Sequence, residues 1–374
     1  MKKKLLAMLM MFVLAISATA CGNQGSEKES DTATAGNEGY ITITDHRGVE
    51  VQVPKNIQRV VIDQVPLTTT YCMYMGGNTD KLVGLSQSVV DVLSKSVLKD
   101  ISPETLKVET GFYKVGELNI EELEKLDPDV VLFNASNQEH AKLFEQAGIP
   151  AVGFSTVGLE AEPDPTKLYA EWLRLLEDVF QEDGKMDAAI AYGDKLIAST
   201  KEKISKNSAD PVPNALILFS YSDGAPSVAG TGHFGGKWLD SIGANNVARD
   251  IKGVKATTVE QIYQWDPDLI FMPGLGQSKL TPEDLYGNKI DNVDWSPITA
   301  VQNKNVFTSN LGMWSWYVLS SDSPLVHLWL AKSAYPQTFA DVDLKQTIKE
   351  YYHNFYKYDL SDTQIEQIIN PQRN

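Results

Sequence analysis

Cysteine is scarce in this sequence, which holds two cysteines, Cys21 and Cys72, among 374 residues. Two thiols exclude a framework of several disulfides and a structural zinc site built from cysteines. Cys72 lies in a small, apolar helical stretch, so we expect a buried packing thiol. Basic residues are also in deficit, since 33 Lys and Arg stand against 49 Asp and Glu and give a net charge of −16. This balance argues against nucleic acid as a partner, because nucleic-acid binding needs clustered Lys and Arg.

The sequence lacks the short motifs that mark several common enzyme active sites. It contains no Gly-x-Ser-x-Gly nucleophile motif and no Walker phosphate loop. A Gly-x-Gly-x-x-Gly string does occur at 230–235, but it lies well beyond its predicted strand rather than directly after it. We therefore predict a protein that is not an enzyme and has no intrinsic cofactor.

The N-terminus carries a targeting signal. Three lysines precede an apolar run at 5–16, which is too short to be favoured as a transmembrane helix. With the small residues that follow, this pattern predicts a signal peptide over residues 1–20. Cys21 comes next, as in the lipobox of bacterial lipoproteins, although Ala18 stands where that motif usually has Leu. We expect Cys21 to be acylated and the protein to be held outside the cell membrane by lipid alone; secretion with cleavage at the same bond stays open.

A polar segment follows the signal peptide. Residues 22–39 contain no large apolar side chain, so they cannot bury enough surface to fold. We therefore predict that residues 21–39, counted from the acylated cysteine, form a disordered tether between the membrane and the folded protein.

One tract occurs twice in the chain. Residues 119–133 and 258–272 share a helical pattern, an Asp-Pro-Asp step and an apolar strand, with the step at 127–129 repeated at 266–268. Two copies of one helix-to-strand unit predict two similar lobes, which we place at 40–164 and 211–374. Clefts between such lobes bind ligands.

Short apolar segments alternate with helical ones in both lobes, which is typical of α/β folds with parallel sheets buried on both faces. The predicted strands include an N-terminal hairpin at 41–53 and the segments 60–62, 81–84, 130–133, 151–154, 215–219, 269–272 and 306–307. The linker at 165–210 contains an amphipathic stretch, 185–206, with apolar residues every three or four positions. It predicts one long helix that connects the lobes.

Several stretches in this order resemble one family. They are the hairpin and following strand at 41–61, the tract at 119–129, the element at 295–307 and the closing segments at 328–336 and 355–362. Together they are similar to the substrate-binding proteins of ABC importers for iron-siderophore complexes, haem and cobalamin. The resemblance covers about residues 40–370; one departure is Ile57, where the family has a second proline.

The resemblance implies two Rossmann-like lobes joined by one long helix, the helical-backbone periplasmic-binding-protein fold. It also implies an ABC permease and its ATPase as partners. In cobalamin-type members one surface glutamate of each lobe docks with the permease, and the repeated tract puts this role on Glu121 and Glu260. The alternative is that both are solvated residues near helix N-termini, where the helix dipole favours acidic side chains.

Ligands of open α/β sheets bind beyond the carboxyl ends of the strands. The residues that we single out in these loops are Gln64, Asn134, Tyr221, His233, Trp314, Trp316 and Tyr317. The last three could form a flat aromatic wall for a macrocycle or an aryl chelator, or could pack in the core of the lobe. His233 could ligate a metal or donate to an oxyanion, or could cap local backbone.

Few His and carboxylate residues occupy these loops, so we assign no site for a bare metal ion. Arginine is also missing there, which argues against a highly anionic chelate. We predict an extracytoplasmic substrate-binding protein that captures an iron complex, such as a siderophore or haem, or a corrinoid, and delivers it to a permease. The alternatives are a small oxyanion such as molybdate, or a ligand-sensing lipoprotein without transport. We expect a monomer.

Overall fold

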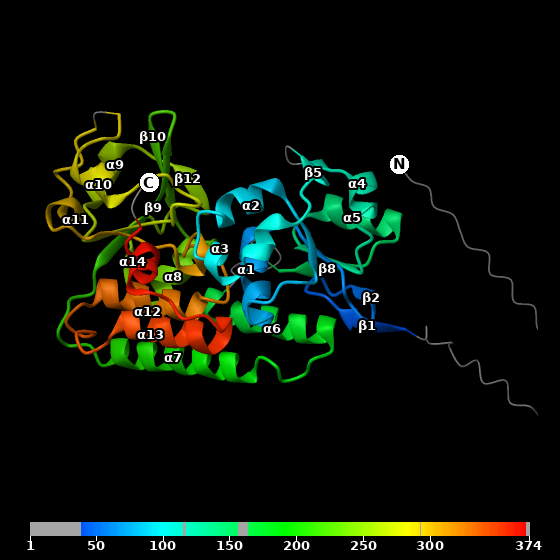
Figure 1. Ribbon diagram of the computed structural model, residues 1–374. Coiled ribbons are helices and arrows are strands. Elements are labelled where there is room, and N and C mark those ends of the chain that lie inside the picture. The colour runs from blue at the N-terminus through cyan, green and yellow to red at the C-terminus, as the bar shows by residue number, and fades with distance from the viewer. Residues whose placement is uncertain (1–38, 115–116, 156–163, 292, 372–374) are drawn as a thin grey trace, which may run out of the picture. The chain divides into compact units, whose positions relative to one another are not determined.

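The computed structural model describes residues 39–371, except 115–116, 156–163 and 292. The predicted signal peptide, Cys21 and the tether lie outside the described residues. From Gly39 onward the chain forms one compact unit that contains two separate sheets with parallel strands (Figure 1). No helix in the described ranges has the length and apolar character needed to span a membrane.

The first sheet has the strand order β4 (Leu82–Leu85), β3 (Val60–Ile62), β7 (Val130–Asn134) and β8 (Ala151–Phe154), all parallel. Alternate residues of β7 enter different apolar clusters, with Val130 and Leu132 on one face and Val131 and Phe133 on the other. Helices therefore cover both faces, which explains why the strand reads as an unbroken apolar run.

The second sheet is mixed. Its order is β12 (Val254–Ala256), β10 (Ala225–Ala229), β9 (Asn214–Ser222), β13 (Leu269–Met272) and β14 (Val306–Thr308), and β11 (Asn245–Asn246) pairs with β9. The strands β9, β13 and β14 are parallel, as predicted, but β10 and β12 are antiparallel. The sequence Asp223-Gly224 forms the β9–β10 turn with φ values of 53° and 77°, which suits a tight hairpin.

The repeated Asp-Pro-Asp step has the same structural role in both sheets. The carboxylate of Asp129 accepts hydrogen bonds from the backbone N–H groups of Gln58 and Arg59, at 2.6 and 2.8 Å. The carboxylate of Asp268 accepts one from the N–H of Asn214, at 2.8 Å. Each step thus fixes the start of its own strand against the neighbouring parallel strand.

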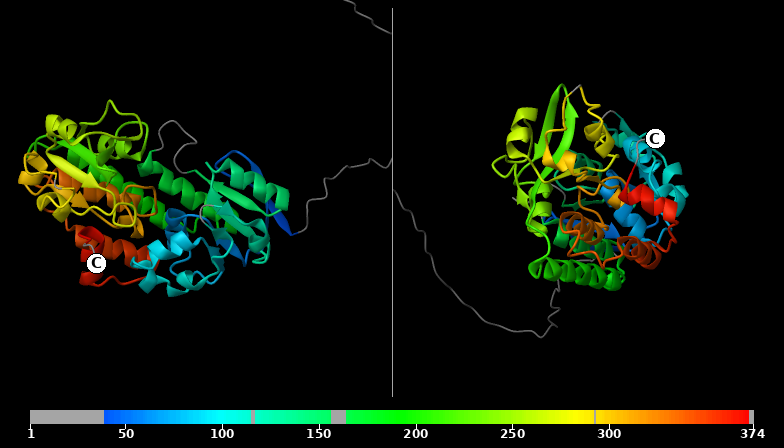
Figure 2. Two further views of the ribbon diagram at one scale, coloured as in Figure 1. Left: turned by 90° about the horizontal axis from the view of Figure 1, so that it is seen from above. Right: turned by 90° about the vertical axis from the view of Figure 1, so that its left-hand side faces the viewer.

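Two helices fill the linker. The predicted long helix is α7 (Asp187–Ser205), which lies along the lower edge of Figure 1 and packs against α12 (Ser323–Ala334). Figure 2 shows α7 at an edge of the molecule from a second direction. Before it comes α6 (Pro165–Phe180), capped by Asp164 and more deeply buried.

Helix α6 touches helices next to both sheets. It contacts α1 (Val65–Tyr74), next to the first sheet, and α8 (Phe234–Ser241) and α12, next to the second. Its buried side chains include Trp172 and Leu173. Helix α6 was not among the predicted helices, and it joins the predicted long helix α7 in the linker.

The remaining helices and strands surround the two sheets. They are β1 (Tyr40–Thr44), β2 (Glu50–Pro54), α2 (Gln87–Leu93), α3 (Leu98–Ile101), η1 (Pro103–Lys107), β5 (Tyr113–Lys114), β6 (Glu117–Leu118), α4 (Ile120–Glu124), α5 (Gln138–Ala147), α9 (Val259–Trp265), α10 (Pro282–Tyr286), α11 (Thr299–Gln302), η2 (Leu311–Met313), α13 (Leu344–Tyr351), the π-helical turn η3 (Tyr352–Tyr356) and α14 (Asp362–Ile369). The predicted N-terminal hairpin is confirmed by the antiparallel pairing of β1 with β2.

Candidate ligand-binding site

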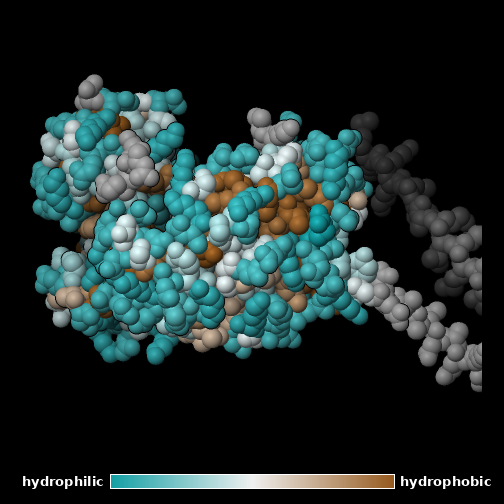
Figure 3. All heavy atoms as spheres, viewed as in Figure 1, coloured by the Kyte–Doolittle hydropathy of each residue, from teal (hydrophilic) through white to brown (hydrophobic). Residues whose placement is uncertain are grey.

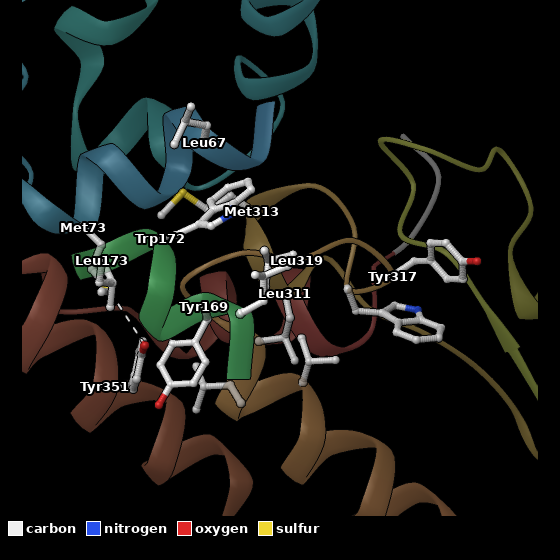
Figure 4. Packing of buried hydrophobic residues seen from close by; sticks show 14 of the residues in the cluster. Leu67, Met73, Tyr169, Trp172, Leu173, Leu311, Met313, Tyr317, Leu319 and Tyr351 are labelled. Atoms are coloured by element: carbon white, nitrogen blue, oxygen red, sulfur yellow. Dashed lines mark hydrogen bonds between the residues drawn. The ribbon is translucent and has the colours of Figure 1, made fainter. Parts of the chain in front are cut away.

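Helix α1 packs against η2, and each of these elements has a predicted ligand residue at one of its ends. Gln64 is the N-cap of α1, and Trp314 directly follows η2. Figure 4 shows Leu67 of α1 on the side that faces Met313 of η2. The end of α1 that follows the first sheet thus meets the loop that follows β14 of the second sheet.

Gln64 and Trp314 each hold an unsatisfied hydrogen-bond donor. Within the described residues, neither the side-chain Nε2 of Gln64 nor the indole Nε1 of Trp314 has a hydrogen-bond partner, although both atoms are buried. A buried donor without a partner costs about 1–3 kcal/mol. Gln64 also makes no side-chain bond to the first turn of α1, so it does not serve as an ordinary helix cap. Both donors suit a ligand that presents acceptor oxygens.

His233 and Tyr317 form a second pair of predicted ligand residues. His233 is the N-cap of α8, and Tyr317 lies in the segment after η2. The imidazole Nδ1 of His233 is hydrogen-bonded to the hydroxyl of Tyr317, and the two rings stack with centroids 5.3 Å apart. Burial lowers the pKa of His233, so the imidazole is neutral near pH 7, and burial raises the pKa of the Tyr317 phenol. A neutral imidazole that is bonded through Nδ1 keeps Nε2 for another partner.

Glycines of the loop 273–276, which follows β13, support the Trp314 backbone. The N–H of Gly276 donates to the carbonyl of Trp314 at 3.1 Å. A Cβ on Gly274 would lie 2.4 Å from the same carbonyl oxygen, which leaves room for glycine alone. The hydroxyl of Ser315 donates to the side-chain oxygen of Gln277 at 2.7 Å. This loop therefore positions Trp314.

The prediction that Trp316 belongs to an aromatic wall for the ligand is wrong. Trp316 is fully buried, its Nε1 donates to the carbonyl of Met272 at 2.6 Å, and its ring packs on Phe271 and Trp329. Tyr317 is also fully buried, against His233 and the rest of the core. The alternative of core packing describes both residues, and of the three aromatics Trp314 alone is partly exposed.

Tyr221 lies apart from the other predicted residues. The β9–β10 register skips Phe219, which is therefore an extra residue in β9. Such a bulge turns the following side chains to the other face of the sheet. Phe219 packs against Tyr317, whereas Tyr221 packs against Trp295 in a different apolar cluster. The hydroxyl of Tyr221 donates to the carbonyl of Gly224, within the hairpin turn.

Asn134 ends β7 as predicted, and two residues next to it were not singled out from the sequence. The carboxyl of Asp63 is buried, its Oδ1 has no partner within the described residues, and its Oδ2 lies 3.8 Å from Nδ1 of His140. Burial raises the pKa of Asp63. Their positions in the sequence could have indicated both residues, because ligands bind beyond the carboxyl ends of strands. Asp63 follows β3, and His140 lies in the first turn of α5, after β7.

The predicted docking glutamates occupy equivalent positions. Glu121 lies in the first turn of α4 and Glu260 in the first turn of α9, and both are exposed. In each helix the N-cap side chain, Asn119 or Thr258, accepts a backbone N–H at 3.1 Å. Figure 1 shows α4 and α9 at the upper edge of the molecule, on either side of the notch that is visible in Figure 3.

Two surface pockets of about 390 and 380 Å³ lie away from these residues. The larger is lined by α7, α12 and residues 339–347, and the smaller by residues around Arg59 and Glu109. Neither pocket is lined by a predicted ligand residue, so the convergence of α1 and η2 remains the candidate site.

A family model described as periplasmic binding protein matches residues 65–310, which is more than half of the chain. The protein belongs to the periplasmic-binding-protein family. This result confirms the resemblance to the iron-siderophore, haem and cobalamin group, and with it the α/β helical-backbone fold.

Relatives extend the comparison over most of this periplasmic binding protein. The molybdate-binding protein MolA of Haemophilus influenzae is 27% identical over 331 residues, which cover 84% of this chain and 90% of MolA. An uncharacterized ABC transporter substrate-binding lipoprotein of Bacillus subtilis, YvrC, is 27% identical over 361 residues, 91% of this chain and 100% of YvrC. The petrobactin-binding protein YclQ of Bacillus subtilis is 25% identical over 331 residues, 83% of this chain and 92% of YclQ.

Solved structures agree with the fold. A periplasmic solute binding protein from Veillonella parvula superposes with a TM-score of 0.76 at 29% identity, over 88% of this chain and 97% of that one. MolA bound to molybdate superposes with a TM-score of 0.69 at 24% identity, over 86% of this chain and 99% of MolA. This periplasmic binding protein is thus a substrate-binding protein of an ABC transporter. Its family consists of solute-binding proteins rather than enzymes. The names of its relatives imply an extracytoplasmic location.

Proposed function

We propose that this protein captures an oxygen-rich, metal-containing solute between its two predicted lobes and delivers it to an ABC permease. A tetrahedral oxyanion of the molybdate class is the ligand that the site favours. One observation carries this choice: Gln64 and Trp314, from segments that pack on each other, both hold buried N–H donors without partners within the described residues.

An oxyanion of this size offers acceptor oxygens and nothing else. Neutral N–H donors can hold such an anion without a cationic side chain, as they do in backbone nests. Helix α1, with ten residues, directs its N-terminus to the same region and adds the positive end of its dipole. The relationship to MolA, which is named for molybdate binding, supports the same ligand class.

A ferric chelate, haem or a corrinoid is the second candidate. The specific observation in its favour is the His233–Tyr317 pair, because imidazole nitrogen and phenol oxygen are iron ligands. The relationship to YclQ, named for petrobactin binding, agrees with it. Since Tyr317 is fully buried, this ligand would require the His233 loop to move.

Tryptophan fluorescence of the purified protein separates the two candidates. The titrants are molybdate, tungstate, sulfate, ferric siderophores, haem and cobalamin. We expect saturable quenching by molybdate and tungstate, because Trp314 lies at the site. A response to ferric chelates or corrinoids alone would establish the second candidate, and no response to any titrant would rule out the proposed ligand classes.

The remaining predicted functions concern the membrane. We propose that Cys21 is acylated and that residues 21–39 tether the folded protein, so replacing Cys21 by serine releases the protein from cells into the medium. We further propose that Glu121 and Glu260, both exposed in equivalent helices, contact the permease. A ligand-sensing lipoprotein without transport would not need this pair of glutamates.

A further inference from the structure

A buried carboxyl group is hydrogen-bonded to η2, the turn that directly precedes Trp314. Asp322, the N-cap of α12, is fully buried and accepts three hydrogen bonds. Its Oδ1 accepts from the hydroxyl of Tyr356 at 2.8 Å. Its Oδ2 accepts from the hydroxyl of Tyr352 at 2.7 Å and from the backbone N–H of Gly312 at 2.9 Å. The group therefore joins the closing segment of the chain to η2.

The two tyrosines come from the π-helical turn at Tyr352–Tyr356, and their rings stack with centroids 4.5 Å apart. Helical turns of this kind are rare and often occur at functional sites. The wider turn presents both hydroxyl groups to one carboxyl. Lys357, with φ of 56°, ends the turn.

The backbone that Asp322 holds is strained. Gly312 and Met313 both have left-handed backbone, with φ of 74° and 68°. This conformation is unfavourable for methionine and persists only where neighbouring contacts enforce it. A Cβ on Gly312 would lie 2.8 Å from Oγ of Ser320, so the loop has little space to rearrange. The next residue is Trp314.

The same network also reaches α1. The neighbour of Asp322, Ser321, donates its N–H to the hydroxyl of Thr70 at 3.2 Å, and its carbonyl accepts from the hydroxyl of Tyr351 at 2.5 Å. The hydroxyl of Tyr351 also lies 3.7 Å from the sulfur of Met73, as the dashed line in Figure 4 shows. Thr70 and Met73 both belong to α1, whose N-cap is Gln64.

We propose that Asp322 is a positioning residue for the ligand site: anchored by Tyr352 and Tyr356, it holds Gly312 and Met313 in their left-handed conformation and thereby orients the indole of Trp314 toward the ligand. The part that concerns ligand affinity rests on the proposed function. The part that concerns the loop does not, because it describes the protein before any ligand binds.

Hydrogen–deuterium exchange of the full chain without ligand tests the loop. The variants are Tyr352→Phe and Tyr356→Phe, each of which removes one hydroxyl from Asp322. The matched control is Tyr169→Phe, because Tyr169 is equally buried but donates to Asp194 and Ile190 in the contact of α6 with α7. We expect exchange at Gly312 to Trp314 to rise about tenfold in the first two variants and to stay within about twofold in the control.

Molybdate titration of the same proteins tests the site. We expect affinity to fall about tenfold in Tyr352→Phe and to be unchanged in Tyr169→Phe. Asp322→Asn, which preserves shape, should give the larger loss; if it does not fold, the tyrosine variants decide. Equal exchange at Gly312 in Tyr352→Phe and the control, or faster exchange with unchanged affinity, would overturn the proposal. If the unmodified protein binds no molybdate, the proposed ligand fails, and the exchange comparison still decides the role of Asp322.

Discussion

The backbone N–H of Ser321 donates a hydrogen bond to the hydroxyl oxygen of Thr70, 3.2 Å away, although 251 residues separate them in the chain. The Thr70 hydroxyl in turn donates to the carbonyl of Pro66 at 2.8 Å. This chain of bonds connects the segment after Trp314 with the first turn of α1. The two unsatisfied donors of the candidate site therefore belong to segments that are fixed to each other, which gives the site a defined geometry before a ligand arrives.

Charge reversal of both docking glutamates should stop transport and leave binding intact. In the variant Glu121→Lys plus Glu260→Lys we expect ligand affinity within about twofold of the unmodified protein, because both residues are exposed on other helices than the one that Gln64 caps. We expect uptake by whole cells to fall at least about tenfold, because reversed charges oppose a cationic partner surface.

The control for this experiment is the variant Glu145→Lys plus Glu283→Lys. It makes the same change of charge at two other exposed glutamates, one on α5 and one on α10. Uptake should be normal in this control. Normal uptake by the Glu121 and Glu260 double variant would remove the docking role of that pair.

Acid should destabilise the protein through His327. Burial lowers the pKa of His327 from 6.5 to about 4, and the side chain is bonded to the carbonyl of Ser241. The unfolded chain therefore binds a proton that the folded protein does not, between about pH 6.5 and 4. Above pH 6.5 the titration of His327 does not change the unfolding free energy. As the pH falls below 6.5, the unfolding free energy decreases, by up to about 3 kcal/mol.

Denaturant unfolding at pH 7 and pH 4.5 measures this effect. In His327→Gln the loss of unfolding free energy on acidification should be smaller than in the unmodified protein by about 2–3 kcal/mol. His353→Gln, at an exposed position, serves as the control and should keep the full loss. An identical loss in His327→Gln and the unmodified protein would show that other groups cause the acid sensitivity.

Cys72 should be chemically inert in the folded protein. It is fully buried, and burial raises the pKa of its thiol to about 12. The reactive thiolate is therefore almost absent at pH 8. In a Cys21→Ser background, iodoacetamide should label less than about a tenth of Cys72 in an hour, and labelling should be complete after unfolding in guanidinium. Rapid labelling of the folded protein, followed by mass spectrometry, would contradict the buried position.

Local patterns in the sequence were sufficient for much of the fold. The apolar strands, the N-terminal hairpin and the repeated Asp-Pro-Asp step predicted the two sheets, because each depends on residues that are adjacent in the chain. Helix α6 was missed although its apolar residues, among them Leu168, Trp172, Leu176 and Val179, recur at helical spacing. The sequence therefore contains the signal for this helix.

The candidate site was harder to predict because its features depend on long-range contacts. Trp314 and Trp316 are alike in sequence context, and their different burial follows from the neighbours that each meets, such as Phe271 and Trp329. The displacement of Tyr221 follows from an extra residue in β9, which the strand pattern does not reveal. The contact of Asp322 with Tyr352 joins positions that no short motif connects.

Isothermal titration of the purified protein with molybdate, beside its Trp314→Phe variant, tests the proposed capture of an oxyanion most directly. Phenylalanine removes the unsatisfied N–H while keeping an aromatic ring, so affinity should fall about tenfold or more while the melting temperature stays equal or rises. Trp295→Phe removes an indole N–H that also has no partner within the described residues but lies in a different apolar cluster, and it should bind normally. We predict one saturable site in the unmodified protein and in Trp295→Phe. Absence of molybdate binding, or equal affinity in Trp314→Phe, would contradict the proposal.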